Sequence, residues 1–135
     1  MTPAGSEARA VRAELTTEER LAVVQEAVLS LRAGQPVVLD MREVTVITDF
    51  FIICHGTSSV HIRALSDRVL ERLEEQGERP GGIEGYRESR WVLLDYGDLV
   101  VHIFAEEERE FYALERLWSD APRRELSPLD DVSPE

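Results

Sequence analysis

Two groups of residues in this chain have types and spacing that suit phosphate and metal chemistry. Gly56-Thr-Ser-Ser59 precedes a predicted helix, where free amides and hydroxyls can either bind an anion or simply cap the helix. Enzymes that transfer nucleotides combine such a turn with carboxylates on a following strand that hold divalent metal ions. This chain offers Asp95 and Asp98 instead, three residues apart across a predicted turn and without a third acid. The pattern favours the helix cap and predicts no catalytic residue.

The other residues that could bind a metal are Cys54, His55, His61 and His102. Their spacings match none of the usual zinc ligand pairs, so we predict no metal and no cofactor. Cys54 is the only cysteine and lies in an apolar run, which favours a small buried side chain and leaves no intrachain disulfide. A reducing compartment follows from this, and we expect a cytoplasmic protein.

Charge and length narrow the class of protein further. The 135 residues suit a single domain with a substantial core, and the formal charge is −12 at pH 7. A binding face for the nucleic-acid backbone needs a surplus of cations, so no direct contact with that backbone is expected and a basic protein partner fits better. All 15 cationic residues are arginines, which excludes chemistry that requires a lysine.

Composition divides the chain into three parts. Residues 1–15 have few apolar side chains and predict a disordered N-terminal arm, residues 16–119 predict the folded domain, and residues 120–135 predict a disordered acidic tail. No run approaches the roughly 20 apolar residues of a membrane span, and the first residues contain no apolar signal segment. We therefore predict no contact with a membrane.

The elements that position these residues follow from capping and periodicity. Thr16-Thr-Glu-Glu19 predicts a capping box, and Leu21, Val24, Val28 and Leu31 form the apolar stripe of a helix that Gly34 and Pro36 end. Strands are predicted over 37–41 and 49–54, the second covered on both faces because its apolar run does not alternate. A second helix is predicted after residue 59, with Ile62, Leu65, Val69 and Leu73 as its apolar stripe and Gly77 as its end. The glycine-rich residues 80–85 predict a loop or a short edge strand.

Residues 91–104 predict a β-hairpin with Tyr96-Gly97 as its two-residue loop. This register pairs Asp95 with Asp98 and Trp91 with His102. Alternation then places Val92, Leu94, Leu99, Val101 and Ile103 on an aliphatic core face, and Trp91, Leu93, Asp95, Asp98, Val100 and His102 on a mixed face available for contacts. A bulged turn would scramble this segregation.

A third helix is predicted after the hairpin, starting among Glu106, Glu107 and Glu108, whose charges suit a helix N-terminus. Phe111, Leu114, Leu117 and Trp118 would supply its buried stripe, with Tyr112 at the flank. Strand, turn and crossover helix together predict an α/β (α+β) fold, with a mixed sheet of four or five strands flanked by helices.

Short motifs spread in order along the chain carry a family resemblance. They are Ile47-Thr-Asp49, Ile52-Ile-Cys54, Gly56-Thr-Ser-Ser59, Gly82-Ile-Glu-Gly85, Trp91-Val-Leu-Leu-Asp95, Gly97-Asp98, Val101-His102, Glu107-Glu108, Tyr112 and Leu114-Glu-Arg-Leu-Trp118. Over roughly residues 17–119 the chain resembles the ribosomal silencing factor family, RsfS, also called Iojap-like. His55 departs from the family, which often has Thr there.

The resemblance implies a nucleotidyltransferase-like fold without catalytic acids. It also implies binding to the large ribosomal subunit through ribosomal protein fourteen, a steric block to small-subunit joining, and lower translation when nutrients are scarce. Alternatives are a large-subunit assembly factor without that block, or a nucleotidyltransferase-like enzyme; a homodimer of the free protein is conceivable from family precedent. The residues we expect to bind the partner are Trp91, Leu93, Asp95, Asp98, Val100, His102, Glu107, Glu108 and Tyr112.

Overall fold

Both long helices begin at the caps that the sequence predicts. The computed structural model of the protein describes residues 15–126. Helix α2 covers Thr17–Ser30; the Thr16 hydroxyl accepts from the Glu19 amide at 3.0 Å, and the Glu19 carboxylate accepts from the Thr16 amide at 2.9 Å, which confirms the capping box. Helix α3 covers Ser59–Glu75, and the Ser58 hydroxyl accepts from the His61 amide at 3.1 Å. The Gly56–Ser59 turn therefore caps a helix, as predicted.

Six strands form one mixed sheet in the order β3-β4-β5-β2-β1-β6. Their bounds are β1 Gly34–Asp40, β2 Phe50–Gly56, β3 Gly82–Glu84, β4 Trp91–Asp95, β5 Leu99–Ala105 and β6 Arg123–Glu125. Only β2 and β5 pair in parallel, and the other neighbours are antiparallel. The predicted fold class is confirmed, with β2 in the interior of the sheet and β3 as the predicted short edge strand.

The sixth strand lies in a segment predicted to be disordered. Arg123–Glu125 pairs with residues 37–39 of β1, so the expected tail from residue 120 is wrong for the residues up to 126. No strand pattern is present in these residues, because all three side chains of β6 are exposed and the strand is held by backbone pairing at the sheet edge. The predicted arm at 1–14 and the remaining tail at 127–135 lie outside the described residues.

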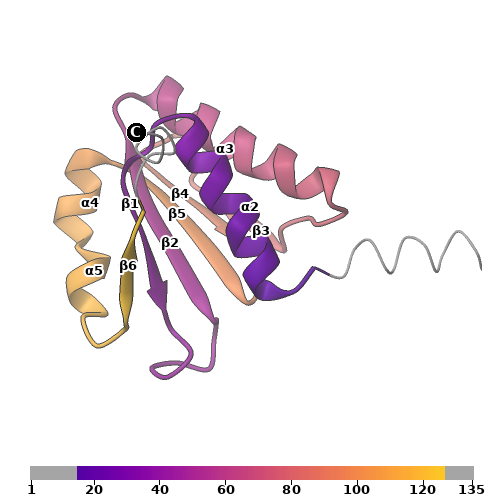
Figure 1. Ribbon diagram of the computed structural model, residues 1–135. Coiled ribbons are helices and arrows are strands. Elements are labelled where there is room, and N and C mark those ends of the chain that lie inside the picture. The colour runs from indigo at the N-terminus through magenta and orange to yellow at the C-terminus, as the bar shows by residue number, and fades with distance from the viewer. Residues whose placement is uncertain (1–14, 127–135) are drawn as a thin grey trace, which may run out of the picture.

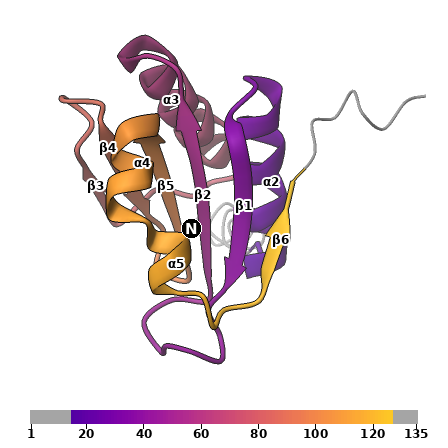
Figure 2. The ribbon, with the colours of Figure 1, turned by 90° about the vertical axis from the view of Figure 1, so that its left-hand side faces the viewer.

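Helices cover both faces of the sheet. Figures 1 and 2 show α2 and α3 on one face, and α4 (Glu106–Tyr112) and α5 (Leu114–Leu117) on the other. Under α2 and α3 lies a core that is aliphatic apart from Phe50 and Cys54; its other buried members include Leu21, Val24, Val28, Ile62, Leu65, Val69, Leu73, Val92, Leu94, Leu99, Val101 and Ile103. A smaller core under α4 and α5 contains Val37, Leu39, Met41, Ile53, Phe104 and Ala121. The predicted apolar stripes of both long helices, apart from half-buried Leu31, therefore lie in the larger core.

The hairpin register differs from the prediction by two residues. Asp95 pairs with Val100 and Trp91 with Phe104, not with Asp98 and His102. Tyr96 belongs to the paired part of the hairpin, because its amide donates to the Leu99 carbonyl at 2.8 Å. The loop therefore consists of Gly97 and Asp98, and Gly97 has a φ of +87°. Because the shift is even, side-chain alternation is unchanged, and the aliphatic face is buried as predicted.

The helix predicted after the hairpin is broken in two. Ala113 adopts a left-handed φ of +48° between α4 and α5, so the second helix starts in a new orientation. One apolar stripe across both is therefore lost: Leu114 and Trp118 pack on the smaller core, whereas Phe111 is 80% exposed and Leu117 is 68% exposed. The prediction that Phe111 and Leu117 are buried is wrong.

The end of α2 also differs from the prediction. The helix stops at Ser30, and Arg32 takes the left-handed conformation with φ +59°. Gly34 instead begins β1 directly under the His55 ring, where an added Cβ would lie 2.2 Å from His55 Nε2. Glycine is needed at this position for close packing and not as a helix stop. Within residues 15–126, no helix combines the length and apolar character that crossing a membrane requires.

Candidate partner-binding face

The structure gathers most of the predicted binding residues on the sheet face that α4 and α5 partly cover. Trp91, Leu93 and Asp95 alternate along β4, and their β5 partners Phe104, His102 and Val100 lie on the same side. We call the rings of Phe51, Trp91, His102, Phe104, Tyr112 and Trp118 the aromatic cluster, because each lies within 6.4 Å of another member between ring centroids. Asp98 is not on this face.

Trp91 is half-buried, and three neighbours fix its ring. Its indole Nε1–H donates to His102 Nδ1 at 3.1 Å. The ring stacks on Phe104 with centroids 4.8 Å apart and tilts against Tyr112 of α4 at 4.6 Å. A large aromatic side chain held in one orientation at the edge of a core is a common anchor in protein interfaces.

His102 lies beneath the face and not on it. The side chain is 4% exposed, and burial lowers its pKa to about 4, so the imidazole is neutral near pH 7. Accepting the indole proton at Nδ1 places the hydrogen on Nε2, which is buried and has no hydrogen-bond partner among residues 15–126. Val100 is only 9% exposed. Neither side chain is therefore available for direct contact as expected, and the His102 ring packs among those of Phe51, Trp91 and Phe104.

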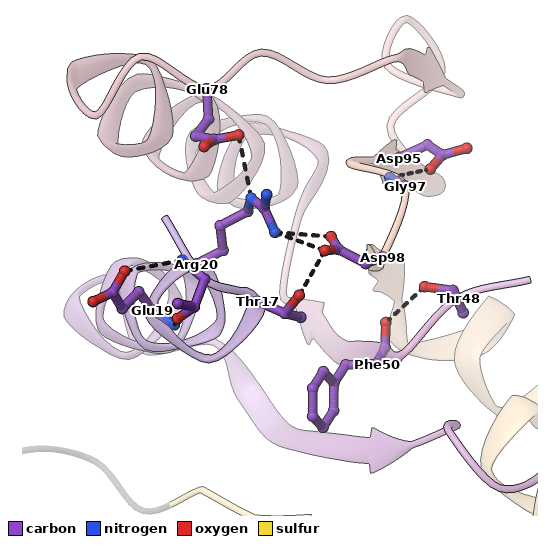
Figure 3. A network of polar contacts seen from close by, with 10 residues as sticks. Thr17, Glu19, Arg20, Thr48, Phe50, Glu78, Asp95, Gly97 and Asp98 are labelled. Carbon is purple, nitrogen blue, oxygen red and sulfur yellow. Dashed lines mark hydrogen bonds and ion pairs between the residues drawn. The ribbon is translucent and has the colours of Figure 1, made fainter. Parts of the chain in front are cut away.

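Asp98 binds within the fold instead of facing solvent. Its two carboxylate oxygens accept from Arg20 Nη1 at 2.8 and 2.9 Å, and one of them also accepts from the Thr17 hydroxyl at 2.6 Å (Figure 3). Arg20 also pairs with Glu78 at 3.2 Å. Asp95 is exposed, and among the residues from 15 to 126 its side chain accepts only from the Gly97 amide, at 2.8 Å. The two carboxylates therefore have different surroundings: Asp98 connects the hairpin to α2, whereas Asp95 is accessible to a partner.

The Gly56–Ser59 turn and these acids lie at opposite ends of the sheet. In the parallel β2–β5 pair, Phe50 is opposite Leu99, whereas Gly56 is opposite Ala105. Six residues of strand separate the two ends by about 20 Å. The Thr57 amide is also occupied, because it donates to His61 Nδ1 at 3.0 Å. The turn, Asp95 and Asp98 cannot act on one substrate, and nowhere in residues 15–126 do three His, Cys, Asp or Glu side chains gather as a metal site.

Acidic and aromatic side chains share the outer surface of α4. Arg90 pairs with Glu108, to which its Nη2 donates at 2.9 Å, and more loosely with Glu107 at 3.3 Å. Hydrogen bonds from Arg90 lower the pKa of Glu108. The Glu107 side chain is 89% exposed, and next to it the Phe111 and Tyr112 rings meet edge to face with centroids 5.0 Å apart. Glu107, Glu108 and Tyr112 are therefore on the surface, beside the aromatic cluster.

The sequence pattern does not predict the positions of Phe111 and Arg109. It predicts Phe111 in the core, but α4 ends at Tyr112 and Phe111 lies on the outer surface, one helical turn from Glu107. Arg109, in the middle of an acidic run, is 6% exposed and holds α4 to the sheet: its Nη1 donates to the Gly34 carbonyl at 3.0 Å and to His55 Nδ1 at 2.9 Å. Its Nη2 donates to Glu115 at 2.7 Å. Burial and the Arg109 charge lower the pKa of His55.

Fold and surface together define a mixed α+β protein with a candidate binding face that is aromatic and acidic, and no group of three His, Cys, Asp or Glu side chains in residues 15–126 forms a metal site. The family model described as "Ribosomal silencing factor during starvation" matches residues 14–135. The chain belongs to the ribosomal silencing factor family.

Individual relatives agree with this assignment. The chain is similar to the ribosomal silencing factor RsfS of Halalkalibacterium halodurans, at 43% identity over 112 residues that cover 83% of this chain and 96% of the relative. A crystal structure of a Chromobacterium violaceum protein superposes with a TM-score of 0.76 at 30% identity, covering 78% of this chain and 88% of that one. A more distant relative is mouse "Mitochondrial assembly of ribosomal large subunit protein 1", at 35% identity over 53% of this chain and 33% of its own length.

Proposed function

We propose that this protein is a ribosomal silencing factor that binds the large ribosomal subunit through ribosomal protein fourteen. Bound there, it blocks association with the small subunit and represses translation under nutrient limitation. The observation that carries the proposal is the family match over residues 14–135, supported by a relative named RsfS that aligns over 96% of its length. The proposed place of action is the cytoplasm, where bacterial ribosomes work.

The binding face supports this proposal on physical grounds. Ribosomal proteins are generally basic, and this chain carries a formal charge of −12. Trp91, Leu93, Asp95, Glu107 and Tyr112 would contact the partner directly, since each is exposed or half-buried. Val100 and His102 would support these contacts from below, with Glu108 held by Arg90 at the margin. Asp98 contributes by fixing the hairpin.

The proposed mechanism requires no catalysed reaction, because the bound protein acts by steric exclusion. A bound domain of this size over a subunit-joining contact would clash with the incoming small subunit. The effect then depends on occupancy, which is set by concentration and affinity. Contacts with protein and not with the nucleic-acid backbone follow from the acidic charge.

Sucrose-gradient sedimentation tests the function. The full chain is mixed with purified large subunits, and small subunits are then added at a magnesium concentration that allows joining. We expect the protein to sediment with the large subunit and the fraction of joined ribosomes to fall as protein is added. Normal joining at saturating protein would contradict the proposed block.

Binding to purified ribosomal protein fourteen tests the face. Truncating a central aromatic anchor commonly costs about 2 kcal/mol or more, roughly thirtyfold in affinity, so we expect Trp91→Ala to weaken binding by that factor. Leu93→Ser should also weaken binding, whereas exposed Val60→Ser, on α3 across the sheet, is the matched control. Equal affinities of the Leu93 and Val60 variants for ribosomal protein fourteen would show that the interface does not lie on this face. Light scattering of the free protein would show whether it is a homodimer.

A large-subunit assembly factor is the second candidate, favoured by the name of the mouse relative. It would bind the large subunit on the same gradient and leave joining unchanged. A nucleotidyltransferase-like enzyme is opposed by the separation of the Gly56–Ser59 turn from Asp95 and Asp98. Incubation with labelled nucleoside triphosphates and Mg²⁺ or Mn²⁺ should give no transfer product.

A further inference from the structure

A hollow on the outer surface of α4 has a composition that suits one kind of ligand. It has a volume of about 390 Å³ and is lined by Glu107, Glu108, Phe111 and Tyr112. These residues form two pairs at helical i, i+4 spacing, Glu107 with Phe111 and Glu108 with Tyr112, so an acid faces an aromatic ring in each row. Carboxylates beside aromatic faces attract cations, because the faces of the rings are electron-rich.

The protein already binds one guanidinium at this margin. Arg90 reaches Glu108 with both Nε and Nη2, and Glu108 keeps only 22% of its side chain exposed. Glu107 receives a single contact of 3.3 Å from the same arginine and stays 89% exposed. Arg90 therefore occupies Glu108 and leaves Glu107 with acceptor capacity directed to solvent.

Phe111 is an apolar side chain left on the surface. The ring is 80% exposed, packs on neither core formed by residues 15–126, and touches Tyr112 edge to face with centroids 5.0 Å apart. Through Tyr112 it is continuous with Trp91, whose centroid lies 4.6 Å from that of Tyr112. The hollow thus adjoins the proposed binding face, although the expected binding residues did not include Phe111.

We propose that this hollow binds an arginine side chain of the basic protein partner. The planar guanidinium stacks on the exposed ring of Phe111 and donates to the Glu107 carboxylate, while Tyr112 borders the site. Arginine fits better than lysine because its flat group can stack and hydrogen-bond at the same time. This inference rests on the proposed function for the identity of the partner, but the site itself can be tested alone.

The first test titrates the full chain with a tetra-arginine peptide, monitored by amide chemical shifts. A tetra-citrulline peptide of the same shape but without charge is the ligand control. We expect shifts centred on residues 107–112 with the arginine peptide only, and a loss of affinity of about two- to fivefold in Phe111→Ala and in Glu107→Gln. The matched controls are Leu117→Ala, which removes another exposed apolar side chain, and Glu110→Gln, which removes an equal charge from the same helix.

Equal effects of Glu107→Gln and Glu110→Gln would overturn the site, because binding would then follow net charge alone. The same four variants are next measured against purified large subunits. Losses confined to the Phe111 and Glu107 variants support the inference, whereas wild-type affinity in both variants overturns the assignment of a partner arginine and leaves the proposed function standing. If the unmodified chain binds no large subunit, the proposed function fails, and the peptide titration alone supports or overturns the cation site.

Discussion

The two faces of the sheet are covered in different ways. Under α2 and α3 the core is largely aliphatic, with Phe50 as its buried aromatic residue, and the hydroxyl of buried Ser66 donates to the Ile62 carbonyl of its own helix. Under α4 and α5 the cover includes buried His55, His102 and Arg109, together with the aromatic cluster. Apolar burial stabilises without direction, whereas buried polar groups cost free energy unless each finds a partner.

The difference indicates a division of roles between the faces. Because the buried apolar cluster under α2 and α3 is the larger one, we expect that face to supply most of the stability. The α4–α5 face places the Trp91 and Tyr112 rings against each other, with centroids 4.6 Å apart. Substitutions on the two faces can test this division.

The largest effect is expected for Leu65→Ala in the aliphatic core. Leu65 is 0% exposed, so the substitution loses burial and leaves a cavity, at about 3 to 5 kcal/mol of the free energy of unfolding. Urea denaturation measures it. Half-buried Leu114, on the other face, is the matched control, and Leu114→Ala should cost clearly less. A larger loss at Leu114 would reverse the comparison between the faces.

His102 should make stability depend on pH. Burial holds its folded pKa at about 4, below the unfolded value of about 6.5, so the unfolded chain binds the proton more readily between these values. Because of His102, the free energy of unfolding should therefore fall by about 3 kcal/mol as the pH is lowered from about 6.5 to 4. Above about pH 6.5 the imidazole is neutral in both states, and this loss is absent. His55, whose pKa is also lowered, acts in the same direction. Denaturation of His102→Gln across this range should show a flatter pH profile, and an unchanged slope would contradict the buried neutral imidazole.

Removing Arg109 should destabilise the attachment of α4. Arg109→Ala leaves Glu115, His55 and the Gly34 carbonyl without their donor. Breaking a fully buried pair costs about 3 to 5 kcal/mol, but the Glu115 side chain is 19% exposed, so we expect about 2 kcal/mol. Exposed Arg116→Ala is the control and should have little effect. Hydrogen exchange should show the added opening in α4 and α5, with α2 and α3 still protected.

The smallest effect separates the two acids of the hairpin. Asp98→Asn weakens the charged contacts with Arg20 and should cost about 1 to 2 kcal/mol, because the Asp98 side chain is one-third exposed. Asp95→Asn should change stability by less than about 0.5 kcal/mol, since that carboxylate is exposed and accepts one local amide. Thermal unfolding measures both. Equal losses would show that the Arg20–Asp98 contact does not brace the hairpin.

Elements whose signals are local could be predicted from the sequence. The Thr16 capping box and the stripe from Ile62 to Leu73 were enough to place the two long helices, and the apolar run of β2 was enough to place it inside the sheet. The aliphatic face of the hairpin was also correct despite the wrong register, because an even shift preserves alternation. The family resemblance rests on motifs between Ile47 and Trp118, several of which lie in β2 and in the hairpin.

The exposure of the polar and aromatic residues depends on the tertiary fold. Ala113 is left-handed and Phe111 is exposed, and Asp98 contacts Arg20 of α2 and does not lie on the candidate binding face. Arg109 stands among acidic residues in the sequence, yet it is buried and bonded to Gly34, His55 and Glu115. Each outcome depends on contacts between residues far apart in the chain, or on a single backbone angle, and neither leaves a periodic signal in the sequence.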